Sequence, residues 1–356
     1  MRIVNNEEKM KEAEAILLDC DGTIIDASKS YDLAIKLATV IVLDKLFNIE
    51  IKLGREIEKT IESLRMTGGF NNDSDTTSAI IQAISIFLPI TVEYNIDKWE
   101  RIEDMNEYIH SVQWERSYPG FVSTALEWLS TTVELDKNYL DLEMIERLID
   151  DKASRLYTSK RLLKLRSFLK YPGAFGESFL TTLFDEIFLG RDGVREKYGQ
   201  EPRYVIYSGT LSNEKILISE ESIRRLTSLF PKGIALITGR GRWETEKTLK
   251  PILDYINMEA SVFTADRGSD FEKPSPKAVL EVARILQSTK LLYVGNSMED
   301  LLMASSASRE GLDVGFIGVV NDRDRAREFE IRGADAIIDD INELPLLIQE
   351  VKFERC

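Results

Sequence analysis

The amino-acid sequence predicts an α/β protein, a doubly wound (Rossmann-like) parallel sheet core with an inserted, mostly α-helical cap domain. Strands and helices of about 10 to 15 residues alternate after residue 210, as is typical of a parallel sheet. An isolated apolar strand, AILL (15–18), has no partner nearby in sequence, and a long helical block follows it. The predicted domains are residues 1–27 with 206–356, and residues 28–205.

Apolar runs bounded by glycine or polar residues define the elements of the core. The segment RYVIYSG (203–209) fits either a linker or a strand that returns to the core. Beyond it the predicted helices and strands alternate without interruption. The predicted helices are 218–230, 243–256, 275–288, 297–308 and 322–334, and the predicted strands are 233–239, 260–265, 290–296, 314–320 and 336–339.

The block between the first strand and the rest of the core has apolar residues at the helical spacing i, i+3, i+4. No clear alternation of period two appears in it. Its longest apolar run, AIIQAISIFLPITV (79–92), contains Gln and Pro and is too short to span a bilayer. The block is therefore predicted to be a helical domain.

Composition excludes several classes of function. Lys and Arg number 46 against 61 Asp and Glu, and the net charge of −15 disfavours binding to nucleic acid or to an anionic membrane. The two cysteines, Cys20 and Cys356, form no C-x-x-C motif, and the single histidine, His110, makes Ser-His-Asp and His-rich metal sites improbable. The charged N-terminal segment is not typical of a signal peptide, so we expect a cytoplasmic protein, either monomer or homodimer.

Residues that can carry chemistry follow the predicted strands. Ligands of open parallel sheets bind beyond the carboxyl ends of the strands. A carboxylate there can attack phosphorus, and a second acid can move protons. Lysine, threonine and glycine amides can orient phosphoryl oxygens, and acids can hold a divalent metal. The segments concerned are DCDGT (19–23), TGR (238–240), EKP (272–274) and GNSMED (295–300).

These segments resemble the four motifs of the haloacid dehalogenase superfamily, in its phosphatase branch. DCDGT is similar to the first motif, ITGR to the second, EKPSP to the third and GNSMED to the fourth, in the expected order. The resemblance covers residues 12–26 and 205–345 and is phosphoglycolate phosphatase-like. It implies that the insertion is a helical cap that selects the substrate.

The resemblance also implies a role for each motif residue. Asp19 would be the nucleophile and a metal ligand, and Asp21 the general acid/base, with its main-chain carbonyl also reaching the metal. Thr238 and Lys273 would bind the phosphoryl group. Asp300 would hold the metal directly or through water.

The fourth motif departs from the family pattern, because Asn296 stands where the family usually has its first aspartate. A neutral amide oxygen binds Mg²⁺ more weakly than a carboxylate, and Asp300 or Glu299 could supply the missing charge. The expected metal ligands are Asp19, Asp21, Asn296 and Asp300. Mg²⁺ is the expected ion, with Mn²⁺ or Co²⁺ as alternatives.

Substrate contacts are expected from both predicted domains. In the helical block, the glycine-rich loop MTGGFNNDSDTT (66–77) is either a turn followed by a helix N-cap at Asp73 or Asp75, or a loop that contacts substrate. GGFNND, DEIFLG (185–190) and GTLSNEKILIS (209–219) also resemble a largely archaeal and bacterial subgroup with no known substrate. The expected substrate-binding residues are Thr23, Gly239, Arg240, Phe70, Asn71 and Asn72.

The predicted function is a Mg²⁺-dependent phosphatase that hydrolyses a small phosphorylated metabolite through an aspartyl-phosphate on Asp19. One alternative is a phosphomutase, which uses the same intermediate but excludes water. Another is a non-catalytic binding protein that kept the fold, and Asn296 is the only residue that favours this alternative. The sequence does not identify the metabolite.

Overall fold

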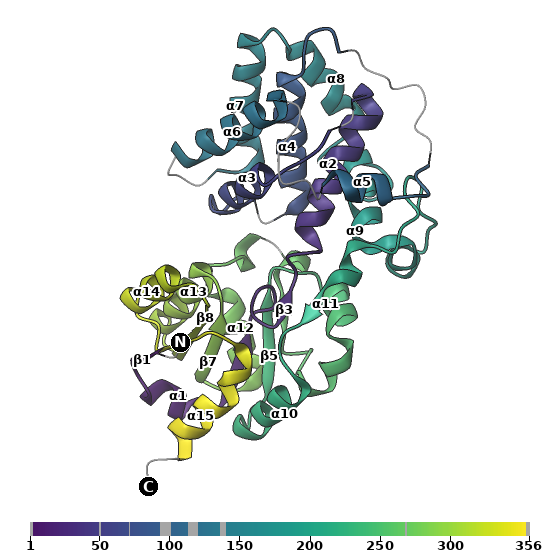
Figure 1. Cartoon of the computed structure of the whole chain (residues 1–356). Coiled ribbons are helices and arrows are strands. Elements are labelled where there is room, and N and C mark those ends of the chain that lie inside the picture. Colours follow the sequence, from purple (N-terminus) through teal and green to yellow (C-terminus); the bar gives the residue numbers. More distant parts are fainter. Residues whose placement is uncertain are drawn as a thin grey trace. The chain divides into compact units, whose positions relative to one another are not determined.

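The structure of the chain, a computed structural model, describes residues 3–49, 51–70, 72–92, 101–112, 120–135, 140–267 and 269–353 (Figure 1). The chain separates into two compact units. The first, here called the core unit, comprises Met1–Ala27 and Glu214–Cys356. The second, the helical unit, comprises Ser28–Asn213.

The core unit is built on a sheet that has seven strands within the described residues. Every neighbouring pair is parallel except β1 and β9. Strand β2 lies between β5 and β7, so the order of the sheet reverses around it. The strands in sheet order are β1 (Ile3–Val4), β9 (Ala336–Ile338), β8 (Asp313–Val319), β7 (Lys290–Gly295), β2 (Ala15–Leu18), β5 (Ile234–Thr238) and β6 (Val262–Phe263).

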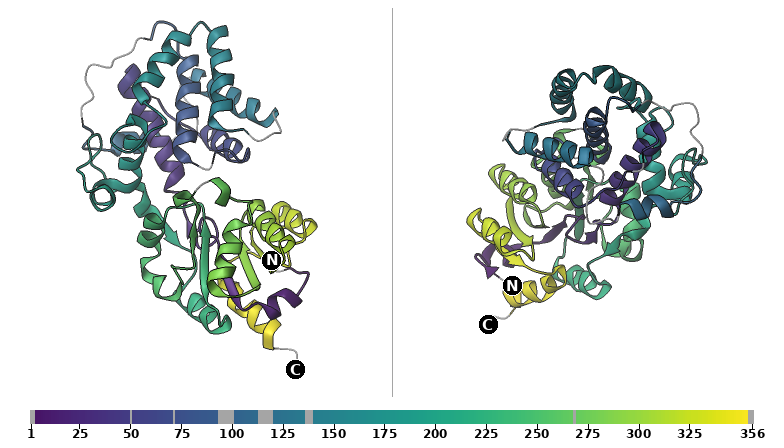
Figure 2. Two further views of the ribbon diagram at one scale, coloured as in Figure 1. Left: turned by 180° about the vertical axis from the view of Figure 1, so that it is seen from behind. Right: turned by 45° about the horizontal axis from the view of Figure 1, so that its top comes forward.

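Helices cover both faces of this sheet, which confirms the predicted doubly wound α/β class (Figure 2). Successive β2 side chains alternate between the faces: Ile16 and Leu18 belong to one apolar cluster, and Ala15 and Leu17 to the other. The helices of the first cluster are α1 (Glu8–Glu12), α10 (Glu220–Leu229), α11 (Arg242–Leu249) and α15 (Leu344–Phe353); those of the second are α12 (Lys277–Leu286), α13 (Met298–Arg309) and α14 (Arg323–Ile331).

The helical unit is centred on α4 (Asp73–Phe87), which packs against α2, α6, α7 and α8. All positions of α4 from Thr76 to Ile86 are buried, as expected of a helix surrounded by others. The remaining helices are α2 (Tyr31–Phe47), α3 (Glu56–Arg65), α5 (Asn106–Ser111), α6 (Gly120–Leu135), α7 (Leu142–Arg155), α8 (Ser159–Leu169) and α9 (Phe179–Tyr198).

The chain returns to the core unit at Asn213/Glu214 and not at the predicted 205/206. The buried carboxylate of Glu186 accepts hydrogen bonds from the backbone N–H groups of residues 203, 204 and 205, at 2.6, 2.7 and 2.9 Å. A Cβ on Gly190 would lie 2.4 Å from the carbonyl carbon of Ser208, so the backbones touch there. Residues 203–209 therefore belong to the helical unit and form no strand of the core sheet.

Some short elements differ from the prediction. Strand β1 and helix α1 lie in the N-terminal segment, for which no element was predicted. The predicted helix 243–256 is α11 followed by a 3₁₀ helix, Lys250–Tyr255, with Pro251 at its start. Strands β3 (Ile25–Asp26) and β4 (Lys215–Ile216) pair antiparallel where the chain leaves and re-enters the core unit.

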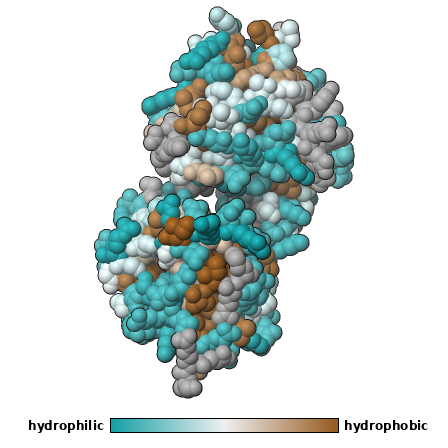
Figure 3. All heavy atoms as spheres, turned by 60° about the vertical axis from the view of Figure 1, so that its left-hand side comes forward, coloured by the Kyte–Doolittle hydropathy of each residue, from teal (hydrophilic) through white to brown (hydrophobic). Residues whose placement is uncertain are grey.

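Within the described residues, no helix has both the length and the apolar character needed to cross a membrane. The face drawn in Figure 3 is mainly hydrophilic, with scattered hydrophobic areas. This agrees with a chain in which 30% of the residues are charged.

Candidate active site

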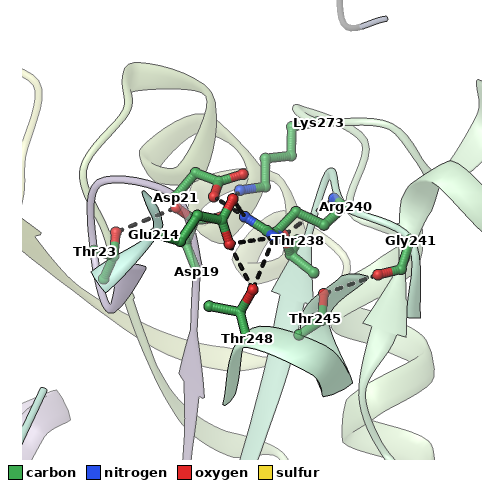
Figure 4. A network of polar contacts seen from close by, with 10 residues as sticks. All are labelled: Asp19, Asp21, Thr23, Glu214, Thr238, Arg240, Gly241, Thr245, Thr248 and Lys273. Atoms are coloured by element: carbon green, nitrogen blue, oxygen red, sulfur yellow. Dashed lines mark hydrogen bonds and ion pairs between the residues drawn. The ribbon is translucent and has the colours of Figure 1, made fainter. Parts of the chain in front are cut away.

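The carboxyl end of β2 is the centre of the candidate active site. Asp19 follows β2 directly. The last residue of β2, Leu18, pairs with Leu236 of β5 on one side and with Val294 of β7 on the other. The point at which strand order reverses is where ligands bind in open α/β sheets. Motif residues from the ends of β2 and β5 and from the loop before α12 meet at this edge (Figure 4). Asp300, which follows β7, joins them through its ion pair with Lys273.

Asp19 and Asp300 share one cation, Lys273. The Lys273 Nζ atom lies 2.5 Å from Asp19 Oδ1 and 2.6 Å from Asp300 Oδ1. Burial raises the pKa of Asp19 to about 7, and the ammonium group of Lys273 opposes that rise. Burial alone would lower the pKa of Lys273, but the two carboxylates hold it well above its usual value. Lys273 is therefore a protonated cation, with its side chain 13% exposed, beside the predicted nucleophile.

Asp300 is fixed by hydrogen bonds to both of its carboxylate oxygens. Tyr293 donates its hydroxyl to Oδ1 at 2.9 Å, and Ser297 donates its backbone N–H and its hydroxyl to Oδ2 at 3.0 and 2.7 Å. Burial would raise the pKa of Asp300, but Lys273 and Ser297 hold it below its usual value. Because both oxygens are engaged and the residue is fully buried, Asp300 holds Lys273 in place. A role for Asp300 in holding a metal, directly or through water, stays a prediction.

Asp21 belongs to a second ion-pair cluster. Arg240 Nη1 lies 2.7 Å from Asp21 Oδ1, and the guanidinium also binds both carboxylate oxygens of Glu214, at 2.9 and 2.7 Å. The side chains of Arg240 and Glu214 are each 1% exposed, whereas that of Asp21 is 39% exposed. Arg240 was predicted to contact substrate; the structure instead places it beneath Asp21, because its charged end is occupied by two carboxylates.

The two predicted hydroxyl contacts are both buried. Thr23 donates to Asp19 Oδ2 at 3.2 Å, so it orients the predicted nucleophile. The Thr238 hydroxyl accepts from the backbone N–H of Arg240 at 3.2 Å. Gly239 lies between Thr238 and Arg240 on the exposed turn after β5, where a Cβ would meet no atom within 4 Å. The backbone of Gly239 is therefore accessible at this turn.

Asn296 lies against the loop that carries Asp21. Gly22 has a φ of +75°, and a Cβ built on it would lie only 2.0 Å from Asn296 Nδ2, so this position requires glycine. In the part of the chain that the structure describes, no group of three or more His, Cys, Asp or Glu residues is arranged to hold a metal ion. A cation here would depend on the Asp19 carboxylate, the Asp21 main-chain carbonyl, the Asn296 amide oxygen and water. This oxygen-only set fits Mg²⁺, which usually keeps several waters.

The glycine-rich loop of the helical unit is a turn and a helix cap. Phe70 is 1% exposed, so its ring packs inside the unit and the prediction that it contacts substrate is wrong. Asn72 is the N-cap of α4, accepting from the backbone N–H of Ser74 at 2.9 Å, whereas the cap was predicted at Asp73 or Asp75. A Cβ on Gly69 would lie 2.1 Å from the carbonyl oxygen of Leu140. Asn71 lies outside the described residues.

Sequence reasoning missed three residues of the two clusters. Ser297 had a signal, since Ser-x-x-Asp after a strand is a capping-box pattern, and Ser297 and Asp300 form that box. Tyr293 lies within an apolar strand pattern, which gave no sign of its hydroxyl contact. Glu214 had no signal, because its partner Arg240 is defined only by the fold.

Known proteins resemble this chain in fold. No family model matches it, and no curated protein does. The phosphatase Tt82 from Thermococcus thioreducens aligns with a TM-score of 0.56 at 18% identity, over 95% of this chain and 99% of that one. The structural-genomics target ZR25 aligns with a TM-score of 0.59 at 16% identity over the same shares. A haloacid dehalogenase-like hydrolase from Bacteroides fragilis gives a TM-score of 0.41 at 15% identity, over 94% and 100%.

The first two alignments extend over almost the whole of both chains, so they include the core and the insertion together. Sequence identities this low show a similarity of fold and no similarity of function or substrate. The four motifs follow strands β2, β5, β6 and β7, and the structure brings them to one edge of the sheet. The chain therefore shares the fold of the first two structures, and in this chain that fold is an α/β core with a helical insertion after the first motif.

Proposed function

We propose that the chain is a divalent-cation-dependent phosphatase that hydrolyses a small phosphorylated metabolite. One observation carries the proposal: the Asp19 carboxylate lies at the carboxyl end of the central strand, oriented by Thr23 and 2.5 Å from the Lys273 ammonium. A second carboxylate, Asp21, stands two residues away and remains partly exposed. This pairing of a nucleophile with a nearby proton carrier suits phosphoester hydrolysis.

In the proposed reaction an Asp19 oxygen bonds to phosphorus while the bond from phosphorus to the leaving oxygen breaks. Asp21 gives its proton to that oxygen, and the alcohol departs. Asp21 then takes a proton from water, whose oxygen bonds to phosphorus and releases phosphate and the Asp19 carboxylate. Lys273 balances charge on Asp19 throughout, and the backbone at Gly239 is proposed to bind a phosphoryl oxygen.

Asp19, the Asp21 carbonyl and Asn296 are the proposed ligands of Mg²⁺, or of Mn²⁺ or Co²⁺. When bound, the cation would neutralise part of the charge on the phosphoryl oxygens. The helical unit is proposed to select the metabolite, as the family resemblance implies.

The test is phosphate release from p-nitrophenyl phosphate and from a panel of phosphorylated metabolites, with each of the three cations. We expect release that stops on chelation and resumes when Mg²⁺ is restored. A metabolite whose phosphate moves to another position without appearing in solution would identify a phosphomutase. Absence of any turnover with all three cations would contradict the proposal and favour a non-catalytic binding protein.

A further inference from the structure

The guanidinium of Arg240 is held in a fixed plane. Glu214 binds it through two oxygens, Oε1 to Nη1 at 2.9 Å and Oε2 to Nη2 at 2.7 Å. Thr248 donates its hydroxyl to Glu214 Oε2 at 2.5 Å. A two-point contact between guanidinium and carboxylate fixes orientation as well as distance. The guanidinium therefore presents Nη1 to Asp21 Oδ1 in one direction only.

Glu214 is itself placed by the chain connections of the core unit. It directly precedes β4, whose Ile216 pairs with Ile25 of β3. Leu217 also donates its backbone N–H to the carbonyl of Ile24 at 2.8 Å. The β3 strand continues from the loop that carries Asp21. The register of these two strands thus brings Glu214 under that loop.

The exposure of the three charged side chains changes along the cluster. Glu214 and Arg240 are 1% exposed, and Asp21 is 39% exposed. A buried carboxylate and a buried guanidinium have little freedom to move, because separating them would leave each charge uncompensated. Only the last member, Asp21, can reach a ligand.

From this geometry we propose that Glu214 and Arg240 are positioning residues: Glu214 orients Arg240, and Arg240 holds Asp21 where it can give a proton to the leaving oxygen. The inference rests on the proposed phosphatase function. It assigns a task to a residue outside the four motifs and replaces the predicted substrate contact of Arg240.

The test compares two aryl phosphates in the full-length chain. Phenyl phosphate has a poor leaving group and needs the acid, whereas p-nitrophenyl phosphate leaves readily without it. The value of kcat/KM covers binding and the first bond cleavage, so it isolates this step. Glu214→Gln keeps the shape of the side chain and removes its charge. We expect it to lower kcat/KM about tenfold for phenyl phosphate and much less for p-nitrophenyl phosphate, since acid catalysis contributes about 100- to 10,000-fold.

The ratio of the two values does not depend on the fraction of chains that fold, so moderate destabilisation does not obscure the result. Thr248→Val, which removes one hydroxyl from Glu214, is expected to shift the ratio in the same direction but less. The matched control is Glu246→Gln. Glu246 lies on α11, the helix that carries Thr248, and pairs with Arg242 at 2.7 Å on the surface. Loss of its charge should therefore leave the ratio unchanged.

A double variant shows whether Glu214 acts through Asp21. In an Asp21→Asn background, adding Glu214→Gln should change the ratio no further, because the acid is already gone. A further change there, or an equal loss for both substrates in Glu214→Gln and Thr248→Val alone, would overturn the inference. If the unaltered chain hydrolyses neither aryl phosphate, the proposed function fails instead.

Discussion

The core unit and the helical unit bury charged side chains in different ways. In the core unit, carboxylates outnumber the cations they share: Asp19 and Asp300 share Lys273, and the partly exposed Asp21 shares Arg240 with the buried Glu214. Both clusters lie at the carboxyl ends of strands, and each includes one of the first motif's aspartates. A surplus of carboxylates in such a place is suited to bind a cation and move protons.

In the helical unit, buried charge serves the architecture. Glu186 is fully buried and accepts three backbone N–H groups. Burial raises its pKa, and those hydrogen bonds oppose the rise. Asn72 caps a helix and Phe70 packs inside. The difference teaches that a buried polar group indicates a site only when its partners leave a charge uncompensated at an accessible edge.

The strongest attempt to break this comparison is Asp19→Asn. Removing the nucleophile should lower kcat by at least about 1,000-fold, because losing one member of a nucleophilic site typically has that effect or more. Phosphate release from p-nitrophenyl phosphate measures it. The matched control is Asp192→Asn, a change at an exposed carboxylate of the helical unit that should leave kcat unchanged. Full activity in Asp19→Asn would remove the core cluster from the chemistry.

A second change tests the architectural reading of the glycine-rich loop. Gly69→Ala should destabilise the chain by about 1–3 kcal/mol, because its Cβ would clash with the Leu140 carbonyl oxygen. Urea denaturation measures the free energy of unfolding. Gly120→Ala, at an open position at the start of a helix, should stabilise by up to about 1 kcal/mol. Equal stability of the two variants would show that the backbones do not touch at Gly69.

Adding a charge sharpens the account of the metal site. Asn296→Asp supplies the carboxylate that the family pattern has, so the Mg²⁺ concentration for half-maximal activity should fall about tenfold, equal to about 1.4 kcal/mol. A titration of activity with Mg²⁺ measures the midpoint. Gln287→Glu adds the same charge at an exposed position of the core unit and should not move it. An unmoved midpoint in Asn296→Asp would show that residue 296 is not a ligand.

The smallest expected effect separates a helix cap from a substrate contact. Asn72→Ala should cost about 1 kcal/mol of stability through the lost N-cap, with KM unchanged. Thermal unfolding and the KM of the best metabolite give the two readings. A raised KM at unchanged stability would contradict the structural role and return the loop to the substrate site.

Much of the fold could be predicted because its signals are local. The alternation of strands and helices after residue 210 and the solitary strand 15–18 predicted the doubly wound sheet and its insertion. The end of the insertion could not be located from the sequence, because the pattern of residues 203–209 fits a linker or a strand of the core. Only the structure shows that Glu186 binds the backbone of this segment. The short strands β1, β3 and β4 have two residues each, too few for a periodic pattern.

The candidate site, like the fold, has a part that could be predicted from the sequence and a part that could not. The positions of Asp19 and Lys273 followed from the strand-end rule and the motif order, and the structure brings them to 2.5 Å. The partners of Asp21 could not be predicted, since Arg240 lies 219 positions away in the chain and reaches it only through the sheet. Glu214 depends further on the register of β3 and β4.

The most direct test of the central claim is to trap a phosphorylated Asp19. In Asp21→Asn, p-nitrophenyl phosphate can still react, because its leaving group needs no acid, but hydrolysis of the aspartyl-phosphate loses its base. We predict a burst of about one nitrophenolate per chain and, after borohydride reduction, homoserine at position 19 in the peptide that contains residues 15–26. Nitrophenolate release without a burst, and with an unmodified Asp19, would contradict the account.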